Sequence, residues 1–279
     1  MLLEIEKEIV LAKKMIEEAE AIIITAGAGM GVDSGLPDFR GSSGFWKAYP
    51  PLSKLGYGFT QMANATLFSL NPKLAWGFYG HRLQLYREIV PHKGFEILLD
   101  LVKKKNENYF IYTSNVDGQF EKAGFDREKI YEVHGSIHYL QCSEACKEEV
   151  WKNNFSDIKV DMERIEAEVL PKCNYCDEIA RPNILMFDDW NFIDTRIAMQ
   201  SKKFEAWKKI NKNKRKVILE IGAGSTIPTL RIYGNMASRT LNTTLIRINP
   251  REPEVSNKSS IGLALGGMDG IEKVCKDFI

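Results

Sequence analysis

Few features of this sequence suit a secreted, membrane or nucleic-acid-binding protein. Its 279 residues hold only five cysteines, an odd number that argues against a complete disulfide framework. No apolar run reaches the roughly 18 residues of a transmembrane helix, and 38 basic against 37 acidic residues provide no basic coat for nucleic acid. A signal peptide has an uninterrupted apolar centre, whereas the apolar residues of the first helix lie on one helical face among charges: Ile5, Ile9, Ala12, Ile16 and Ala19. We therefore expect a cytoplasmic protein without a direct nucleic-acid or membrane partner.

The chain alternates between strand and helix patterns. Short apolar runs that end in small or polar residues predict buried strands at 21–25, 109–113, 217–221 and 245–248. Helical patterns separate them at 93–105, 117–123, about 195–212, and 228–238. Strands that alternate with helices pair in parallel, so we expect an α/β fold with a doubly wound parallel sheet.

Two stretches interrupt this rhythm. Residues 42–92 are rich in aromatics and helix formers, and residues 138–182 hold four of the cysteines and many charges. A chain of this length fits one large domain with a smaller insert. We expect these two stretches to form a small lobe beside a core made of 1–41, 93–137 and 183–279.

A glycine cluster follows the first predicted strand, with Gly27, Ala28 and Gly29 ahead of Val32. Glycines at this place let backbone N–H groups approach a pyrophosphate. The G-x-G-x-G order differs from the usual dinucleotide spacing, G-x-G-x-x-G. By itself the cluster therefore fits a tight strand-to-helix turn as well as a phosphate loop.

The cysteines form two close pairs, Cys142 with Cys146 and Cys173 with Cys176. Two thiolate pairs that converge suit a closed, tetrahedral, structural zinc site. Free thiols are the alternative. We favour zinc because paired thiols at short spacing are more often metal ligands than cystines in a reducing cytosol.

Further stretches of sequence carry a family resemblance. They read GAGMGVDSGLPDFRG (27–41), TSNVDGQFEKAG (113–124), EVHGSIHYLQC (132–142), RPNILMFDD (181–189), IGAGSTIP (221–228) and LIRIN (245–249). In this order they resemble the signature motifs of the sirtuin family of NAD-dependent protein deacylases. The resemblance covers about residues 21–270, nearly the whole chain.

The resemblance implies a Rossmann-like NAD-binding domain and a small lobe made of a helical module and a zinc ribbon. It also implies NAD and zinc as cofactors and an acyl-lysine protein as substrate. In the family, the acyl oxygen displaces nicotinamide from its ribose, and a histidine then helps to deprotonate a ribose hydroxyl, so that O-acyl-ADP-ribose is released. His134 matches that histidine, a residue type whose charge changes near neutral pH. Asn115 matches a family residue near the reacting ribose.

The same resemblance implies a set of NAD-binding residues. Asn115 and Asp117 also fit ordinary turn chemistry, because both residue types cap turns. With Val116, Asp117 would bind the nicotinamide carboxamide. The implied set is Gly27, Ala28, Gly29, Val32, Asp38, Phe39, Arg40, Ser114, Asn115, Val116, Asp117, Gly222, Gly224, Ser225, Asn249 and Asp269.

Two further features concern the substrate. Tyr79 and Arg82 lie three apart on one face of a predicted helix, and the pair resembles the Y-x-x-R with which some sirtuins hold acidic acyl groups. An ordinary amphipathic helix with an exposed arginine is the alternative. A predicted strand at 183–187, with Leu185 and Phe187, suits pairing with an extended peptide. The resemblance thus implies lysine deacylation, with succinyl or malonyl groups favoured over acetyl groups.

The sequence also departs from the family. Gly31 stands in place of serine, Ser114 in place of glutamine and Phe120 in place of histidine, while Asp188 and Asp189 replace Gly-Glu. The first cysteine pair has one extra residue and the adenosine loop is one residue short. ADP-ribosyl transfer to a protein, or plain NAD cleavage, would use the same cofactor chemistry. A non-catalytic NAD-sensing module would lack the base.

Overall fold

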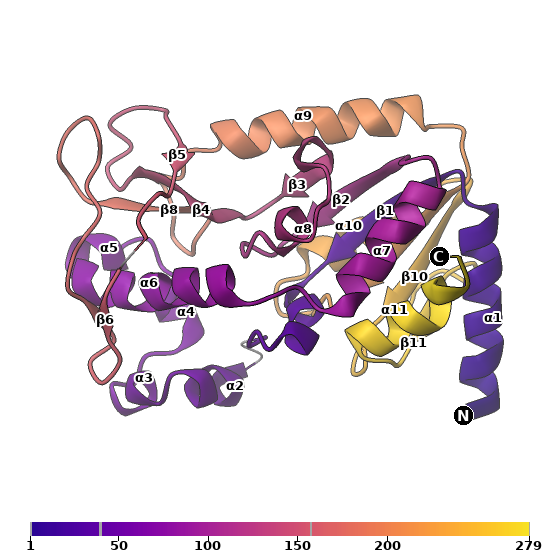
Figure 1. Cartoon of the computed structure of the whole chain (residues 1–279), viewed down its shortest axis with the longest axis horizontal. Coiled ribbons are helices and arrows are strands. Elements are labelled where there is room, and N and C mark those ends of the chain that lie inside the picture. The colour runs from indigo at the N-terminus through magenta and orange to yellow at the C-terminus, as the bar shows by residue number, and fades with distance from the viewer. Residues whose placement is uncertain (1, 39–40, 157, 279) are drawn as a thin grey trace.

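The computed structural model of the protein describes residues 2–38, 41–156 and 158–278. At its centre lies a parallel sheet (Figure 1), whose strands are hydrogen-bonded in the order β11-β10-β9-β1-β2-β3. The strands are β1 (Ala21–Ala26), β2 (Tyr109–Thr113), β3 (Ile130–Glu132), β9 (Lys216–Ile221), β10 (Thr243–Ile248) and β11 (Ile261–Leu263). This order is that of a doubly wound Rossmann-like sheet, so the predicted α/β fold is confirmed. The two edge strands β3 and β11 were not predicted.

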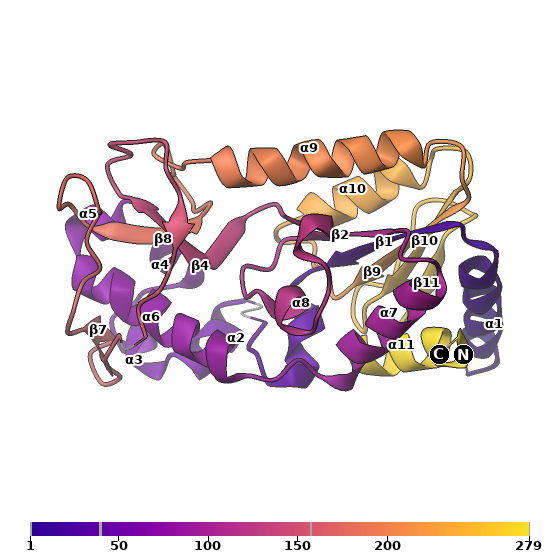
Figure 2. The same ribbon diagram turned by 45° about the horizontal axis from the view of Figure 1, so that its top comes forward.

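Helices cover both faces of the sheet. On one face lie α1 (Leu2–Glu18), α7 (Lys93–Lys104) and α11 (Gly267–Cys275). On the other face lie α9 (Thr195–Ile210) and α10 (Thr229–Ala237), as Figure 2 shows. Successive residues of β1 serve opposite faces, since Ile22 and Ile24 pack in the first layer and Ile23 in the second. Both layers exclude water, which explains why the central strands are apolar throughout.

One buried ion pair crosses the centre of this sheet. Glu220 of β9 and Arg247 of β10 are directly opposite one another in the strand register and form a salt bridge. Both side chains are at most 1% exposed. Arg247 also donates from Nη2 to Oδ1 of Asn235, at 3.1 Å. A charge at this depth is tolerated because it is paired and hydrogen-bonded.

The small lobe combines helices with short antiparallel strands. Its helices are α2 (Gly41–Ala48), α3 (Pro50–Lys54), α4 (Phe59–Met62), α5 (Leu67–Leu70) and α6 (Pro72–Glu88). Its strands are β4 (Gly135–Cys142), β5 (Trp151–Lys152), β6 (Val160–Asp161), β7 (Glu166–Ala167) and β8 (Ala180–Ile184). The two segments that form it share one apolar core, although they are separated in the chain by β2 and β3.

The first residues of α6, the longest helix of the small lobe, determine where the helix begins. Asn71 caps α6 through its side chain, which accepts the N–H of Leu74 at 3.1 Å. Pro72 follows at a position where a proline costs no hydrogen bond.

The remaining short elements are α8 (Gln119–Lys122) and the 3₁₀ helices η1 (Ala28–Ser34), η2 (Arg127–Lys129) and η3 (Lys276–Phe278). Within the described ranges, every helix is too short or too polar to cross a bilayer.

Candidate active site

A cavity of about 560 Å³ opens at the carboxyl ends of β1, β2 and β9 and continues under α6 of the small lobe. The strand order reverses between β1 and β9, and ligands of doubly wound sheets bind at such a point. The volume lies within the roughly 300–1,000 Å³ of small-molecule sites. Of the predicted residues, those that line the cavity are Gly27, Ala28, Asp38, Tyr79, Arg82, Ser114, Asn115, Val116, Asp117, His134, Leu185, Phe187, Gly222, Gly224 and Ser225.

The glycine loops after β1 and β9 lie directly against each other. A Cβ on Gly27 would come within 2.8 Å of Ala223 Cα and of Gly222 O, so no other residue fits at position 27 without movement. The backbone N–H of Gly29 donates to Gly222 O at 3.0 Å. Gly29 and the half-exposed Val32 lie outside the cavity wall. The cluster is therefore a tight turn, and its first two residues also face the cavity.

Asn115 and Asp117 form the wall that follows β2. Asn115 Nδ2 donates to Gly27 O at 3.0 Å, which ties this wall to the glycine loop. One carboxylate oxygen of Asp117 accepts the N–H of Gln119 at 3.0 Å. Burial, opposed by the hydrogen bond from Gln119 and assisted by the nearby Glu132, raises the pKa of Asp117 to about 6. Asp117 thus both forms a turn and lines the cavity, while Asn115 lines the cavity and bonds the facing loop.

His134 lies in the turn between β3 and β4 and faces the same cavity. Burial lowers the pKa of its imidazole below the ordinary 6.5, while a backbone hydrogen bond at Ser114 acts in the opposite direction. The ring is therefore neutral at neutral pH and can accept a proton. Gly135 has φ +81° and a Cβ there would meet Asn183 O at 2.0 Å, so this turn requires a glycine.

The other three histidines have structural hydrogen bonds. His81 Nδ1 bonds the hydroxyl of Tyr49 at 2.9 Å, and His138 Nε2 bonds the carbonyl of Asp117 at 2.9 Å. His92 accepts an N–H of its own helix, α7, and so caps it. His134 is the histidine that faces the cavity.

At the adenosine end predicted by the resemblance, Ser225 is held by Glu252. The carboxylate of Glu252 accepts both the backbone N–H of Ser225, at 3.1 Å, and its hydroxyl. Asn249 is fully buried behind this loop, where Nδ2 donates to Ala223 O at 2.8 Å and Oδ1 accepts the N–H of Glu252 at 3.1 Å. Asn249 therefore orders the loop from behind. Asp269 lies on α11, exposed and paired with Lys273, away from the cavity wall.

The helix α6 supplies the small-lobe wall through Tyr79, Arg82 and Tyr86, which share one face. Arg82 is only 7% exposed, so the alternative of an exposed arginine is wrong. Its Nε and Nη2 donate to the Tyr86 hydroxyl at 2.9 and 2.5 Å. The guanidinium also lies 5.1–5.8 Å from the ring centroids of Phe78, Tyr79 and Tyr86, within cation–π range.

The predicted strand at 183–187 is displaced, because β8 ends at Ile184. Beyond it, the Phe187 N–H donates to Ala63 O at 2.9 Å, and its carbonyl accepts the N–H of Ala65 at 3.1 Å. The backbone of Phe187 thus already pairs with the small lobe. The side chains of Leu185 and Phe187, 43% and 40% exposed, line the cavity.

A buried ion pair closes the turn after this segment. Asp189 and Arg181 meet at 2.6 Å, with both side chains at most 1% exposed. The second oxygen of Asp189 accepts the N–H of Met186 at 3.3 Å. Asp188 adopts φ 51°, and its carboxylate accepts from Asn64 Nδ2 at 2.8 Å. The two aspartates that depart from the family pattern therefore hold the 184–189 turn in place.

Several cavity residues were not predicted from the sequence. Tyr86 could have been found, because it lies four residues after Arg82 on the same helical face. Most of the others come from irregular segments that show no periodicity, while Phe59, Ile184 and Leu230 lie at or next to the ends of α4, β8 and α10. The others are Leu36, Pro37, Phe59, Ala63, Ile184, Met186, Ala223, Thr226, Ile227, Leu230, Arg251 and Glu252. Phe39 and Arg40, expected near the ribose and phosphates, lie outside the described residues.

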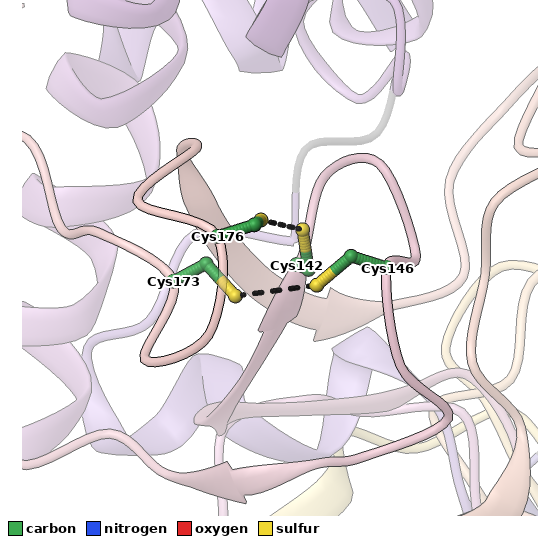
Figure 3. A group of neighbouring side chains, drawn as sticks. All are labelled: Cys142, Cys146, Cys173 and Cys176. Carbon is green, nitrogen blue, oxygen red and sulfur yellow. Dashed lines mark hydrogen bonds between the residues drawn. The ribbon is translucent and has the colours of Figure 1, made fainter.

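The four paired cysteines converge in the small lobe, as Figure 3 shows. Their sulfur atoms all lie within 4.8 Å of one another, and the pairs Cys142–Cys176 and Cys146–Cys173 are 3.6 Å apart. A tetrahedron of thiolates at about 2.3 Å from zinc requires sulfur separations of about 3.8 Å. The donor set therefore fits one structural zinc ion.

Comparisons with known proteins agree with this architecture. The sequence model of the Sir2 family matches residues 27–227. The chain is 26% identical to an NAD-dependent protein deacylase of Aquifex aeolicus, over 91% of this chain and 93% of the relative. It is 31% identical to an NAD-dependent protein deacetylase of Saccharolobus solfataricus, over 64% of each. A Sir2 homologue solved with NAD has the same fold, with a TM-score of 0.68 and 22% identity over 96% of this chain and 94% of that one.

Proposed function

Because this chain belongs to the Sir2 family, we infer that it is an NAD-dependent protein deacylase, an enzyme that removes acyl groups from lysine side chains. The observation that carries this function is the position of His134. It faces a single cavity that runs from the glycine loops to the buried face of α6. NAD supplies the ribose that receives the acyl group and releases nicotinamide.

Different residues of the cavity would bind the cofactor and transfer the proton. Gly27, Ala28 and Gly224 expose backbone toward the cofactor, as phosphate groups require. Asp117 offers a carboxyl group to the carboxamide of nicotinamide. Neutral His134 accepts the ribose hydroxyl proton, since burial lowers its pKa.

Asn115 positions the reacting centre, because its side chain already spans to Gly27 O. A zinc ion held by the four cysteines would be structural, since four thiolates would fill a tetrahedral coordination sphere. The four cysteines lie outside the cavity wall.

We further propose that the enzyme acts on succinyl- or malonyl-lysine. Tyr79 and Arg82 are buried at the α6 end of the cavity, where an acyl chain would end. A guanidinium provides a bidentate site for a carboxylate, which strengthens the bond in a desolvated place. Burial also raises the pKa of Tyr79 to about 12, so its hydroxyl stays protonated and can donate.

The test is incubation with NAD and peptides that carry acetyl-, malonyl- or succinyl-lysine, with products weighed by mass spectrometry. We expect O-acyl-ADP-ribose, free nicotinamide and unmodified lysine. ADP-ribose attached to protein, or nicotinamide release without loss of the acyl group, would instead indicate ADP-ribosyl transfer or NAD cleavage. Arg82→Met should lower kcat/KM for succinyl-lysine by about one to two orders of magnitude. Arg87→Met, on the same helix outside the cavity wall, is the matched control.

A further inference from the structure

The guanidinium edge with which an arginine normally binds a carboxylate is already hydrogen-bonded in Arg82, to the hydroxyl of Tyr86. Nε and Nη2 form that edge, and both donate to the single hydroxyl oxygen of Tyr86. In bidentate arginine–carboxylate pairs two parallel N–H groups bind the two carboxylate oxygens. Tyr86 lies one turn further along α6, is 5% exposed and lines the same cavity. Its hydroxyl therefore occupies the position that a carboxylate would take.

The contact between Arg82 and Tyr86 lowers the cost of binding a neutral acyl group beside the guanidinium. When a ligand fills the cavity it displaces water, and a buried donor that has lost its acceptor then opposes binding. Arg82 keeps the Tyr86 hydroxyl as its acceptor, because the hydrogen bonds at 2.9 and 2.5 Å remain when water leaves. An acetyl group can therefore bind beside Arg82 without leaving this edge unsatisfied.

We propose that Tyr86 sets the acyl range of the enzyme: its hydroxyl stands in for the acyl carboxylate, so that both neutral and acidic acyl-lysines are accepted. This inference rests on the proposed deacylase function and deepens it. A succinyl or malonyl carboxylate displaces the phenol from the Nε–Nη2 edge, since a charge-assisted bond between two ions is stronger than a bond to a neutral oxygen.

The surroundings of Tyr86 support a neutral hydroxyl that can be exchanged. Burial raises the pKa of the phenol, an effect that the charge of Arg82 only partly offsets. The backbone is anchored independently, because Gln119 Nε2 donates to the Tyr86 carbonyl at 3.2 Å. The side chain can thus change its partner while the helix end stays in place.

The experiment measures binding of fluorescent acetyl- and succinyl-lysine peptides to the full chain without NAD. Removal of the phenol hydroxyl in Tyr86→Phe should weaken acetyl-lysine binding about tenfold and change succinyl-lysine binding less than threefold. In the double variant Arg82→Met/Tyr86→Phe, acetyl-lysine binding should return to within about threefold of wild type, because replacing both partners with apolar groups is nearly neutral. Succinyl-lysine binding should stay weak there.

Tyr109→Phe provides the control, because it removes a phenol hydroxyl that accepts the N–H of Asp126 in the sheet domain, outside the cavity wall. It should leave the ratio of the two affinities unchanged. Equal weakening of both peptides by Tyr86→Phe, or no recovery in the double variant, would overturn the inference, as would a wild-type protein that binds neither peptide. Binding with the expected ratios but no NAD-dependent turnover would instead refute the proposed deacylase function.

Discussion

The backbone N–H of Leu185 donates to the carbonyl oxygen of His134 at 2.9 Å. This bond joins the turn that carries the proposed base to the segment whose side chains line the substrate side of the cavity. The neighbouring pairs of β4 and β8 continue the same contact, with Gly135 opposite Ile184. A displacement of the 184–189 turn would therefore move His134 as well.

Loss of the base should abolish most activity. His134→Ala should lower kcat/KM by about two to four orders of magnitude, the usual contribution of a positioned base. The pH profile of the wild type should fall on the acidic side only below about pH 6.5, because burial lowers the pKa of His134 and the neutral form is needed. His81→Gln, outside the cavity wall, is the control. Near-normal turnover by His134→Ala would show that another group is the base.

Asp117→Asn should stabilise the protein while it harms cofactor binding. With a folded pKa of about 6 against an ordinary 3.8, the folded state binds the extra proton between these pH values. The free energy of unfolding of the wild type should therefore rise as pH falls through 6. At pH 8 the neutral Asn should raise it by about 3 kcal/mol, and at pH 4 the gain should vanish. Urea unfolding at the two pH values measures this difference, and an equal effect at both would contradict it.

One zinc ion per chain should accompany the protein when it is purified without chelator. Cys173→Ala should lose the metal and destabilise the small lobe, because folding and metal binding are coupled at such sites. Cys275→Ala is the matched control, since Cys275 lies on α11, buried in the apolar core of the sheet domain and away from the cysteine cluster. Elemental analysis that finds no zinc in the wild type would refute the site.

Gly27→Ala should disturb the cofactor end of the cavity. Its methyl group would come within 2.8 Å of two backbone atoms of the facing loop, so the two glycine loops must separate. We expect at least a tenfold rise in the Kd for NAD, measured by calorimetry, with a lower melting temperature. Gly266→Ala, where a methyl group meets nothing within 4 Å, should change neither. Unchanged NAD affinity in Gly27→Ala would mean that NAD does not bind against this loop.

The sequence was sufficient where a pattern repeats over many residues. The four central strands and their helices follow from apolar runs and helical periodicity, and Tyr79 and Arg82 were correctly placed on one face. Burial of Arg82 could not be read from the same pattern, because it depends on rings from one short stretch of α6 closing around a charge. A single arginine looks the same in sequence whether it is exposed or buried.

Short and irregular segments account for most of the rest. The edge strands β3 and β11 have three residues each, too few to show a period. The strand predicted at 183–187 moved because Arg181 and Asp189 pair across the turn and Phe187 pairs with the small lobe. Such tertiary contacts override a local apolar run.

The buried pair of Glu220 and Arg247 also makes incorrect registers between β9 and β10 unfavourable. If β10 slipped by one residue against β9, Glu220 would face Ile246 or Ile248, and each charge would lie in the interior without its partner. An uncompensated buried charge costs about 3–5 kcal/mol, a large part of the usual stability of a folded domain. The nearby pairs of β9 and β10, such as Ile218 with Leu245 and Leu219 with Ile246, are aliphatic and could be exchanged without such a cost. The ion pair therefore makes misaligned strands unfavourable during folding, before the cavity has formed.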